Sequence, residues 1–145
     1  MGQLSLARAN YDLLIELDIL SEEGQLRECS KLQSSGFMDL VLEPLPFMNS
    51  ITEDDAVFFS LAHYRLENGD LCQEPEMVLM AYPDKREVHA FSFQQAIPPV
   101  YQEVFDENGR ERKMLRNQLN SFLNTWITTG IQQQFDATQW KAAYA

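Results

Sequence analysis

Several polar side chains that can donate, accept or transfer a proton fall within one short stretch of the chain. They are His63, Tyr64, Asn68, Asp70, Glu74 and Glu76. An imidazole beside carboxylates can act as a general base, or the same groups can hold a metal ion. Their spacing matches no established metal or catalytic motif, and the turn signal Asn68-Gly69-Asp70 explains part of the set without any ligand. The 63–76 segment is the first candidate for a binding site, with turn formation and packing as the simpler interpretation.

The other histidine and the cysteines add no metal or redox signal. His89 falls in a different expected strand from His63, and neither has the HExxH or HxH spacing of a metal site. Cys29 and Cys72 are far apart and form no CxxC pair, so we expect reduced, buried thiols. The sequence contains no GxGxxG, P-loop or GxSxG motif. We expect no metal, no cofactor and no catalytic residue that can be named.

A group of basic residues opens the last expected helix, where the helix dipole favours acidic residues. The group consists of Arg110, Arg112, Lys113 and Arg116. Asp106 and Glu107 precede it and can neutralise it, which favours a structural role. The alternative is a patch for a small anion or an acidic partner, helped by the free N–H groups at a helix start.

Apolar residues at helical spacing predict a helix at each end of the chain. Residues 4–20 carry a wide apolar face. Residues 110–129 give the clearest pattern, and Gly130 stands where a helix C-cap is expected. The tail, residues 131–145, is expected to form either a short docked helix or a frayed end.

Between these helices the hydrophobic pattern changes to period two, which is typical of strands. The expected strands are 29–33, 37–43, 56–66, 76–82 and 87–95, with 101–105 as a short edge strand. The pattern predicts an α+β fold with an antiparallel sheet of four or five strands, flanked by the N-terminal helix and the long amphipathic C-terminal helix. No linker interrupts the sequence. We therefore expect one domain over 1–145, made of a helical segment (1–28), the sheet (29–105), the helix (110–130) and the tail (131–145).

The charge of the chain is strongly acidic and unevenly distributed. It has 22 acidic and 11 basic residues, for a net charge of −11, and eleven acidic but only three basic residues precede residue 61. Such a field repels nucleic acid backbones, so direct DNA or RNA binding is not expected. No apolar run approaches the roughly 20 residues that span a membrane. The first residues lack the basic and apolar regions of a signal peptide. We expect a cytoplasmic protein without membrane contact.

Several strings taken together carry a family resemblance. They are Gly36-Phe37-Met38-Asp39-Leu40-Val41, Ser60-Leu61-Ala62-His63-Tyr64, Asn68-Gly69-Asp70-Leu71, Glu74-Pro75-Glu76-Met77, Tyr101-Gln102-Glu103-Val104-Phe105 and Leu119-Asn120-Ser121-Phe122-Leu123-Asn124-Thr125-Trp126. In combination they resemble a family of small bacterial domains of unknown function, encoded in conjugative elements and phage-related regions. The resemblance covers about residues 30–130. It implies a bacterial cytoplasmic setting and mobile DNA, and it supplies no catalytic residues.

The absence of a catalytic motif favours a binding role. We expect a non-catalytic binding or accessory protein of a bacterial mobile element, acting through contacts with a protein partner that the sequence does not identify. A homodimer is compatible with the sequence. One alternative is a DNA mimic that inhibits a nuclease or restriction system through its acidic field. The other is a small enzyme with its site near the 63–76 hairpin loop.

Overall fold

One antiparallel sheet makes up most of the described chain, and helices lie towards both ends of the sequence. The computed structural model describes residues 2–52 and 54–143, without the side chains of residues 65–67 and 70–73. In chain order the elements are α1 (Gln3–Glu16), β1 (Ser30–Leu32), β2 (Leu40–Pro44), η1 (Pro46–Met48), β3 (Val57–Glu67), β4 (Asp70–Tyr82), β5 (Glu87–Gln95), β6 (Val100–Glu103), α2 (Lys113–Thr125), η2 (Trp126–Ile131), α3 (Gln132–Gln134) and β7 (Lys141–Ala142).

The seven strands lie in the order β6-β5-β4-β3-β2-β1-β7, and each neighbouring pair is antiparallel. This confirms the predicted α+β class, the antiparallel sheet and the two flanking helices. The predicted number of four or five strands is wrong, because the short outer strands also join the sheet. β7 has only two residues, too few for a hydrophobic pattern, and it brings the expected tail back to pair with β1. None of the described helices is long and apolar enough to cross a membrane.

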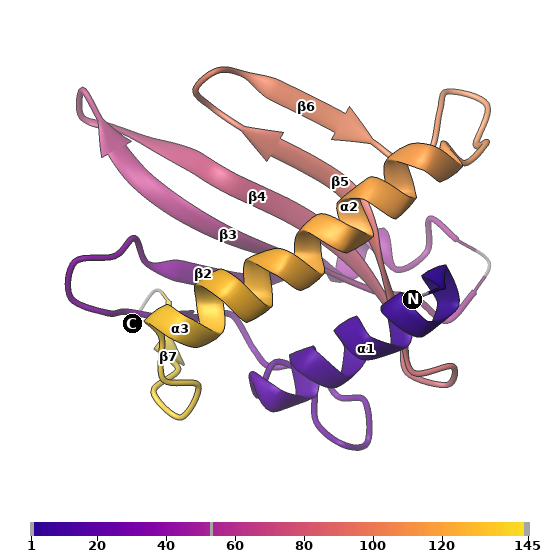
Figure 1. The fold of residues 1–145 in the computed structure, drawn as a ribbon, viewed down its shortest axis with the longest axis horizontal. Coiled ribbons are helices and arrows are strands. Elements are labelled where there is room, and N and C mark those ends of the chain that lie inside the picture. Colours follow the sequence, from indigo (N-terminus) through magenta and orange to yellow (C-terminus); the bar gives the residue numbers. More distant parts are fainter. Residues whose placement is uncertain (1, 53, 144–145) are drawn as a thin grey trace.

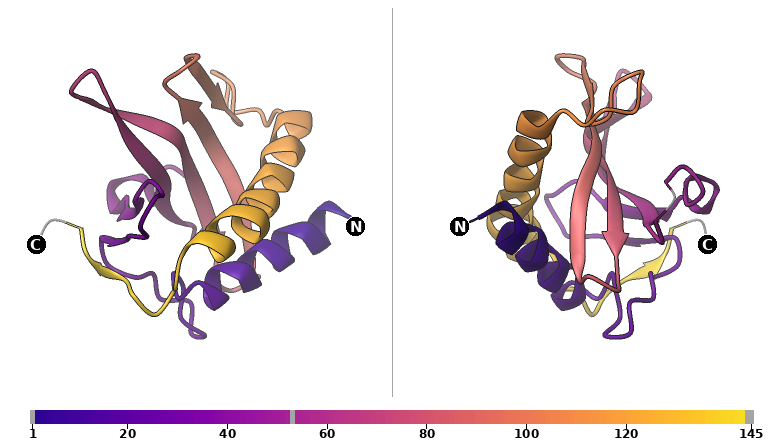
Figure 2. Two further views of the ribbon diagram at one scale, coloured as in Figure 1. Left: turned by 60° about the vertical axis from the view of Figure 1, so that its left-hand side comes forward. Right: turned by 90° about the vertical axis from the view of Figure 1, so that its right-hand side faces the viewer.

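Both helices cover the same face of the sheet. Figure 1 shows α2 running diagonally across the strands with α1 beside it, and Figure 2 shows both helices on one side of the sheet. The main core lies between the helices and this face. Burial of its apolar side chains drives the layers together. Its members include Tyr11, Leu14, Leu42, Phe59, Leu61, Met77, Leu79, Leu123 and Ile127, each without exposed surface.

The N-terminal helix is shorter than its hydrophobic pattern predicts. α1 ends at Glu16 rather than near residue 20. Asp18 has a φ of 62°, which a helix does not accommodate. Arg27 stabilises this bend, because its Nε donates a hydrogen bond of 2.8 Å to the carbonyl oxygen of Asp18.

The C-terminal helix is shifted along the sequence. It begins at Lys113 rather than residue 110, since the preceding segment folds back through an isolated bridge between Phe105 and Glu111. It also does not stop at Gly130. The π-helical turn η2 and then α3 continue it to Gln134.

The β3–β4 hairpin is longer than predicted. Its turn is formed by Asn68 and Gly69, with φ values of 54° and 84°. β4 begins at Asp70 instead of Glu76, although Pro75 argues against a strand interior. The proline is accommodated because the β3–β4 register shifts opposite it, where a ladder hydrogen bond is not required.

A second and smaller cluster lies on the opposite face of the sheet. Ala56, Phe58 and Met80 are buried there, beneath the segment around η1. The Leu45 N–H donates to the carbonyl oxygen of Phe58, and the Asn49 side chain accepts from the Phe58 N–H. The right panel of Figure 2 shows this segment on the side away from both helices. It covers only one end of that face.

Buried asparagines join both helices to β5. Asn120 of α2 accepts a hydrogen bond of 2.8 Å from the Ala90 N–H through its Oδ1. Its backbone carbonyl oxygen accepts one of 3.0 Å from Asn10 of α1, and the Asn124 side chain donates to Asn10 in turn. β6 pairs with β5 only at residues 92–95. Asn120 therefore supplies the partner that Ala90 lacks on that edge.

Candidate functional site

His63, the first candidate for acid–base chemistry, lies in the core. The residue is 5% exposed, and its ring packs edge-on to Trp126 and stacks on Phe135 at centroid distances of 5.5 and 5.9 Å. Its Nδ1 lies 3.3 Å from the carbonyl oxygen of Asp39. Burial lowers the pKa of His63, against the smaller opposing effect of backbone hydrogen bonds. The ring is a packing group on the helix-covered face.

Tyr64 and Glu76 lie together on the other face of the sheet. The Tyr64 hydroxyl donates a hydrogen bond of 3.1 Å to Glu76 Oε2 across the β3–β4 ladder. Partial burial raises the pKa of the Glu76 carboxyl, the bond from Tyr64 lowers it, and the charge of Glu43 raises it further. The charge of Glu43 therefore acts on the Glu76 carboxyl across this face.

The other residues of the predicted 63–76 site lie along the β3–β4 hairpin. Asn68 is exposed at the hairpin turn, where its positive φ accounts for its identity. Glu74 is half-buried on β4, next to the register shift. The side chain of Asp70 lies outside the described residues. Of the predicted set, the structure thus brings Tyr64 and Glu76 together and places His63 on the opposite face.

A second tyrosine–carboxylate pair, on β6, was not among the predicted site residues. The Tyr101 hydroxyl donates a hydrogen bond of 2.7 Å to Glu103 Oε1, and Tyr101 is 58% exposed. The hydrogen bond to Glu103 raises the pKa of Tyr101 to about 12, with burial and the charges of Glu103 and Glu76 adding to the effect. These residues are two positions apart in an expected edge strand, and this spacing alone predicts that their side chains share one face of the sheet.

These side chains define one surface, which we call the open face: Glu43, Tyr64, Glu76, Tyr101 and Glu103. Strand pairing connects Glu43 to Glu103 through Ser60, Val78 and Ser92, one residue from each intervening strand. Residues directly opposite each other share a face, and at about 4.8 Å per strand the row is roughly 19 Å long. Small side chains form its floor, with Ser60 4%, Ala62 1% and Ser92 6% exposed.

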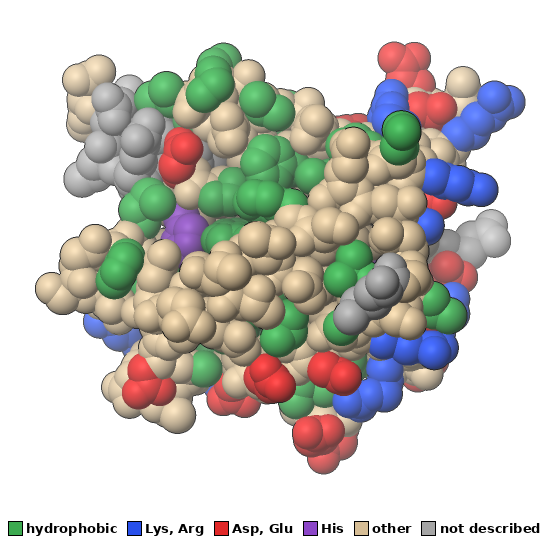
Figure 3. Space-filling view, in the orientation of Figure 1, with side chains coloured by type: hydrophobic (Ala, Val, Ile, Leu, Met, Phe, Trp, Pro, Cys, Tyr) green, Lys and Arg blue, Asp and Glu red, His purple; other side chains and the backbone are tan. Residues whose placement is uncertain are grey.

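The predicted basic patch is divided between structural contacts and solvent. Arg112 Nη1 donates to the carbonyl oxygens of Glu103 and Phe105, at 2.9 and 3.2 Å, and Arg116 Nη1 forms an ion pair of 2.6 Å with Glu111. The side chains of Arg110 and Lys113 are exposed and form no ion pair with the described residues. The four residues therefore do not point into one anion site. Figure 3 shows Lys and Arg side chains gathered where both helices begin.

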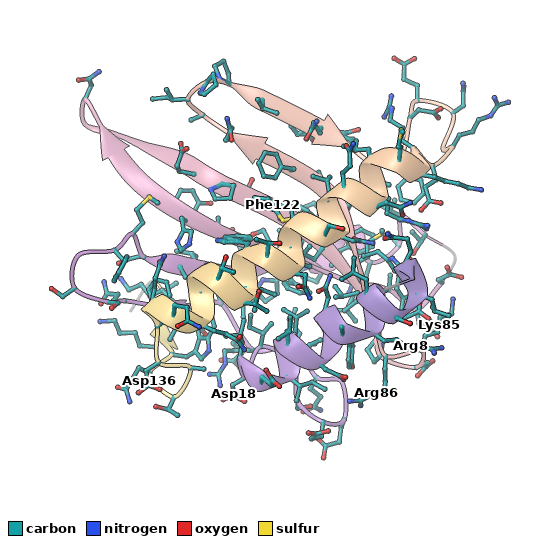
Figure 4. All side chains as sticks on the ribbon, viewed as in Figure 1. Arg8, Asp18, Lys85, Arg86, Phe122 and Asp136 are labelled. Atoms are coloured by element: carbon teal, nitrogen blue, oxygen red, sulfur yellow. The ribbon has the colours of Figure 1, made fainter. Side chains whose placement is uncertain are left out.

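More basic side chains lie near α1. Figure 4 labels Arg8 on α1 and Lys85 and Arg86 at the β4–β5 turn. Arg86 pairs with Asp12 at 3.4 Å, and its guanidinium lies 5.2 Å from the centre of the Tyr11 ring. The helix side of the protein is therefore mixed in charge, whereas three of the five open-face residues are acidic.

One cleft is lined in part by the chain's own tail. It has a volume of about 560 Å³ and lies between the segment after α1 and β7. Trp140 Nε1 donates a hydrogen bond of 2.8 Å to the carbonyl oxygen of Leu17, and the Arg27 guanidinium lies 5.7 Å from the Trp140 ring centre. Burial raises the pKa of the Cys29 thiol in this cleft, which disfavours a reactive thiolate.

A smaller pocket of about 150 Å³ contains His89. The His89 Nε2 lies 3.1 Å from Glu87 Oε1, and Tyr82 packs against the ring edge-on at 6.0 Å. The Asn120 side chain lies 3.4 Å from His89 Nδ1. Both ring nitrogens thus have partners in the fold. Within the part of the chain that the structure describes, no group of three or more His, Cys, Asp or Glu is placed to hold a metal ion.

Comparison with known proteins gives a family but no characterised relative. No curated protein and no solved structure matches the chain significantly. The model of one family, Domain of unknown function (DUF6908), matches residues 12–136, which include the end of α1, all of α2 and strands β1 to β6. The chain therefore belongs to the DUF6908 family.

Proposed function

We propose that this protein is a non-catalytic binding protein whose open face contacts a protein partner with a basic surface. The main support for this proposal is a pair of tyrosine–carboxylate hydrogen bonds, Tyr64–Glu76 and Tyr101–Glu103. Both lie on a part of the sheet that no described helix covers. A solvated sheet face needs polar residues, but it does not need tyrosines that already hold carboxylates in fixed positions.

The chemistry of the open face suits protein recognition. Tyrosine is enriched at the centres of interfaces because it adds contact area with few rotatable bonds. Carboxylates on a chain of net charge −11 attract a basic partner and speed its association. Lys31 lies on the same face, opposite Val41, so the attraction of the open face for a basic partner is weakest at the β1 end.

The biological setting is part of the proposal. The resemblance described above implies a bacterial mobile element, and an accessory protein of such an element acts by binding other proteins. A partner encoded beside this gene, or a host defence protein with a basic active site, meets the charge requirement.

The two alternatives predict different behaviour. An enzyme that uses His63 with Glu76 is disfavoured, because these residues lie on opposite faces of β3 and β4 and cannot reach one substrate. A DNA mimic would use the same open face, since its carboxylates are spread over β2, β4 and β6. Duplex DNA would compete with a DNA mimic for its partner and would leave other partners bound.

The test compares two variants of equal charge. One carries Glu43→Gln, Glu76→Gln and Glu103→Gln on the open face. The control carries the same change at three exposed positions after α1, namely Glu22, Glu23 and Glu28. Each is used to capture proteins from a bacterial lysate, with quantitative mass spectrometry of the captured proteins.

We expect at least one basic protein to bind the wild type and the control but to be lost, roughly tenfold or more, from the open-face variant. Equal recovery with all three proteins would refute the role of the open face. Competition by duplex DNA then decides between a general partner and a DNA-binding target.

A further inference from the structure

The outer edge of β6 pairs with no other strand among the described residues. β6 is the last strand on its side of the sheet. The Val104 N–H donates to Phe91 of β5, and alternate residues of an antiparallel strand turn their backbone groups to the same side. The N–H and C=O groups of Tyr101 and Glu103 therefore point away from the sheet.

We propose that a second copy of this chain pairs with this edge, strand β6 against strand β6, about a two-fold axis at Gln102. In this register Tyr101 of one copy lies opposite Glu103 of the other, and both pairs exchange their N–H···O=C bonds. The partner is a second copy because the edge is complementary to itself.

Neighbouring groups restrict the pairing to this register. Pro98 and Pro99 precede β6 and have no N–H to offer. At the other end, Arg112 Nη1 already occupies the carbonyl oxygens of Glu103 and Phe105. The Glu103 carbonyl keeps a second lone pair. Only Tyr101 and Glu103 remain to form a complete set of strand bonds.

The side chains fit the same arrangement. On the open face each Glu103 carboxylate would lie opposite a Tyr101 phenol and not opposite another carboxylate, which avoids like-charge repulsion. Tyr101 on this strand is 58% exposed, and Ile97, in the turn before it, is 46% exposed. A groove of about 420 Å³, lined by Tyr101, Gln102, Glu103, Arg112 and Leu115, provides space for an added strand.

This pairing would join two sheets into one and bring two open faces side by side. A partner with two basic patches would then be held at both. Pairing at the β6 edge needs no other protein, so it can be measured on the purified chain.

Gln102 gives a direct test, because it would face its own copy at a position where the strands do not exchange hydrogen bonds. Paired Cα atoms are about 4.5 Å apart there, which suits a disulfide. In a background with Cys29→Ser and Cys72→Ser, Gln102→Cys should form a disulfide-linked dimer at least about tenfold faster than Gln118→Cys. Gln118 is exposed on α2 and serves as the matched control.

Sedimentation equilibrium of the uncross-linked chain gives an independent measurement. We expect a concentration-dependent dimer that Gln102→Lys weakens roughly tenfold, by placing two charges opposite each other, while Gln118→Lys leaves it unchanged. Equal cross-linking rates for the two cysteine variants, or a wild type that stays monomeric throughout, would overturn the proposal.

Discussion

Neighbouring residues of β3 have different roles because they lie on opposite faces of the sheet. His63 is enclosed by Trp126 and Phe135 on the helix-covered face, and burial lowers its pKa. Tyr64 follows it directly and holds Glu76 on the open face, where the pKa of the carboxyl is raised. A polar residue stabilises the core on one face and remains available to solvent on the other. The face, and not the spacing in the sequence, determines which residues can meet a ligand.

The largest expected difference between the faces is in stability. His63→Ala should lower the free energy of unfolding by about 2–4 kcal/mol, because it leaves a cavity beside two aromatic rings. Tyr101→Ala on the open face should change it by less than about 1 kcal/mol. Urea denaturation followed by tryptophan fluorescence measures both. Similar losses in the two variants would mean that the faces do not differ as described.

The pH dependence of stability should carry the signature of the buried imidazole. The unfolded chain binds a proton at His63 near pH 6.5, whereas the folded chain resists it. Stability should be fully present above pH 6.5 and fall as the pH drops from there to the lowered folded pKa, by at most about 1.4 kcal/mol per pH unit. His63→Phe should remove this component. Urea midpoints between pH 5 and 8 provide the measurement, and an unchanged slope in the variant would contradict it.

The titration of Glu76 should change the stability of the fold with pH in the opposite direction from that of His63, and by a smaller amount. Its pKa is raised in the fold above the ordinary value of 4.5, so its stabilising contribution is present below pH 4.5 and is lost as the pH rises through the folded pKa. Glu76→Gln should therefore stabilise the protein at pH 7, by less than about 0.5 kcal/mol because solvent screens this half-buried group. Glu43→Gln serves as a comparison, since it removes the neighbouring charge and should lower the pKa of Glu76.

The smallest expected effect is a change in the pKa of Tyr101, which spectroscopy can follow. Tyr101 should be the tyrosine that ionises with a pKa of about 12, chiefly because it donates to Glu103. Glu103→Gln should move that pKa back towards 10 without a measurable change in stability. Carbon-13 NMR of labelled tyrosine rings follows each phenol, and Tyr101→Phe assigns the signal. A Tyr101 pKa that is the same in both proteins would show that this hydrogen bond is not formed.

Periodicity was sufficient to predict the class of fold and the two helices, because core burial imposes a repeat of 3.6 on helices and of two on strands. It was insufficient for β7, whose Lys141 and Ala142 are both exposed and pair with a strand far away in the sequence. The start of β4 was predicted too late, because Pro75 argues against a strand interior. The local sequence pattern contains no sign of the register shift that accommodates this proline.

The site was predictable only in part. Tyr64 and Glu76 belonged to the predicted group and do meet, whereas strand alternation, applied to His63, would have separated it from them in advance. Tyr101 and Glu103 have the same alternation and were overlooked. The contacts of Arg112 depend on the fold-back of the segment before α2, which requires the three-dimensional structure.

The bond between Asn120 and the Ala90 N–H has a consequence for the order in which the protein folds. The strands from β3 to β6 are joined by short turns and can pair early, but one backbone group of β5 finds its partner only when α2 arrives. Asn10 of α1 bonds to the same asparagine from a distance of 110 residues. We infer that the final folding barrier includes the docking of both helices as one step, so the sheet does not persist as an independent intermediate.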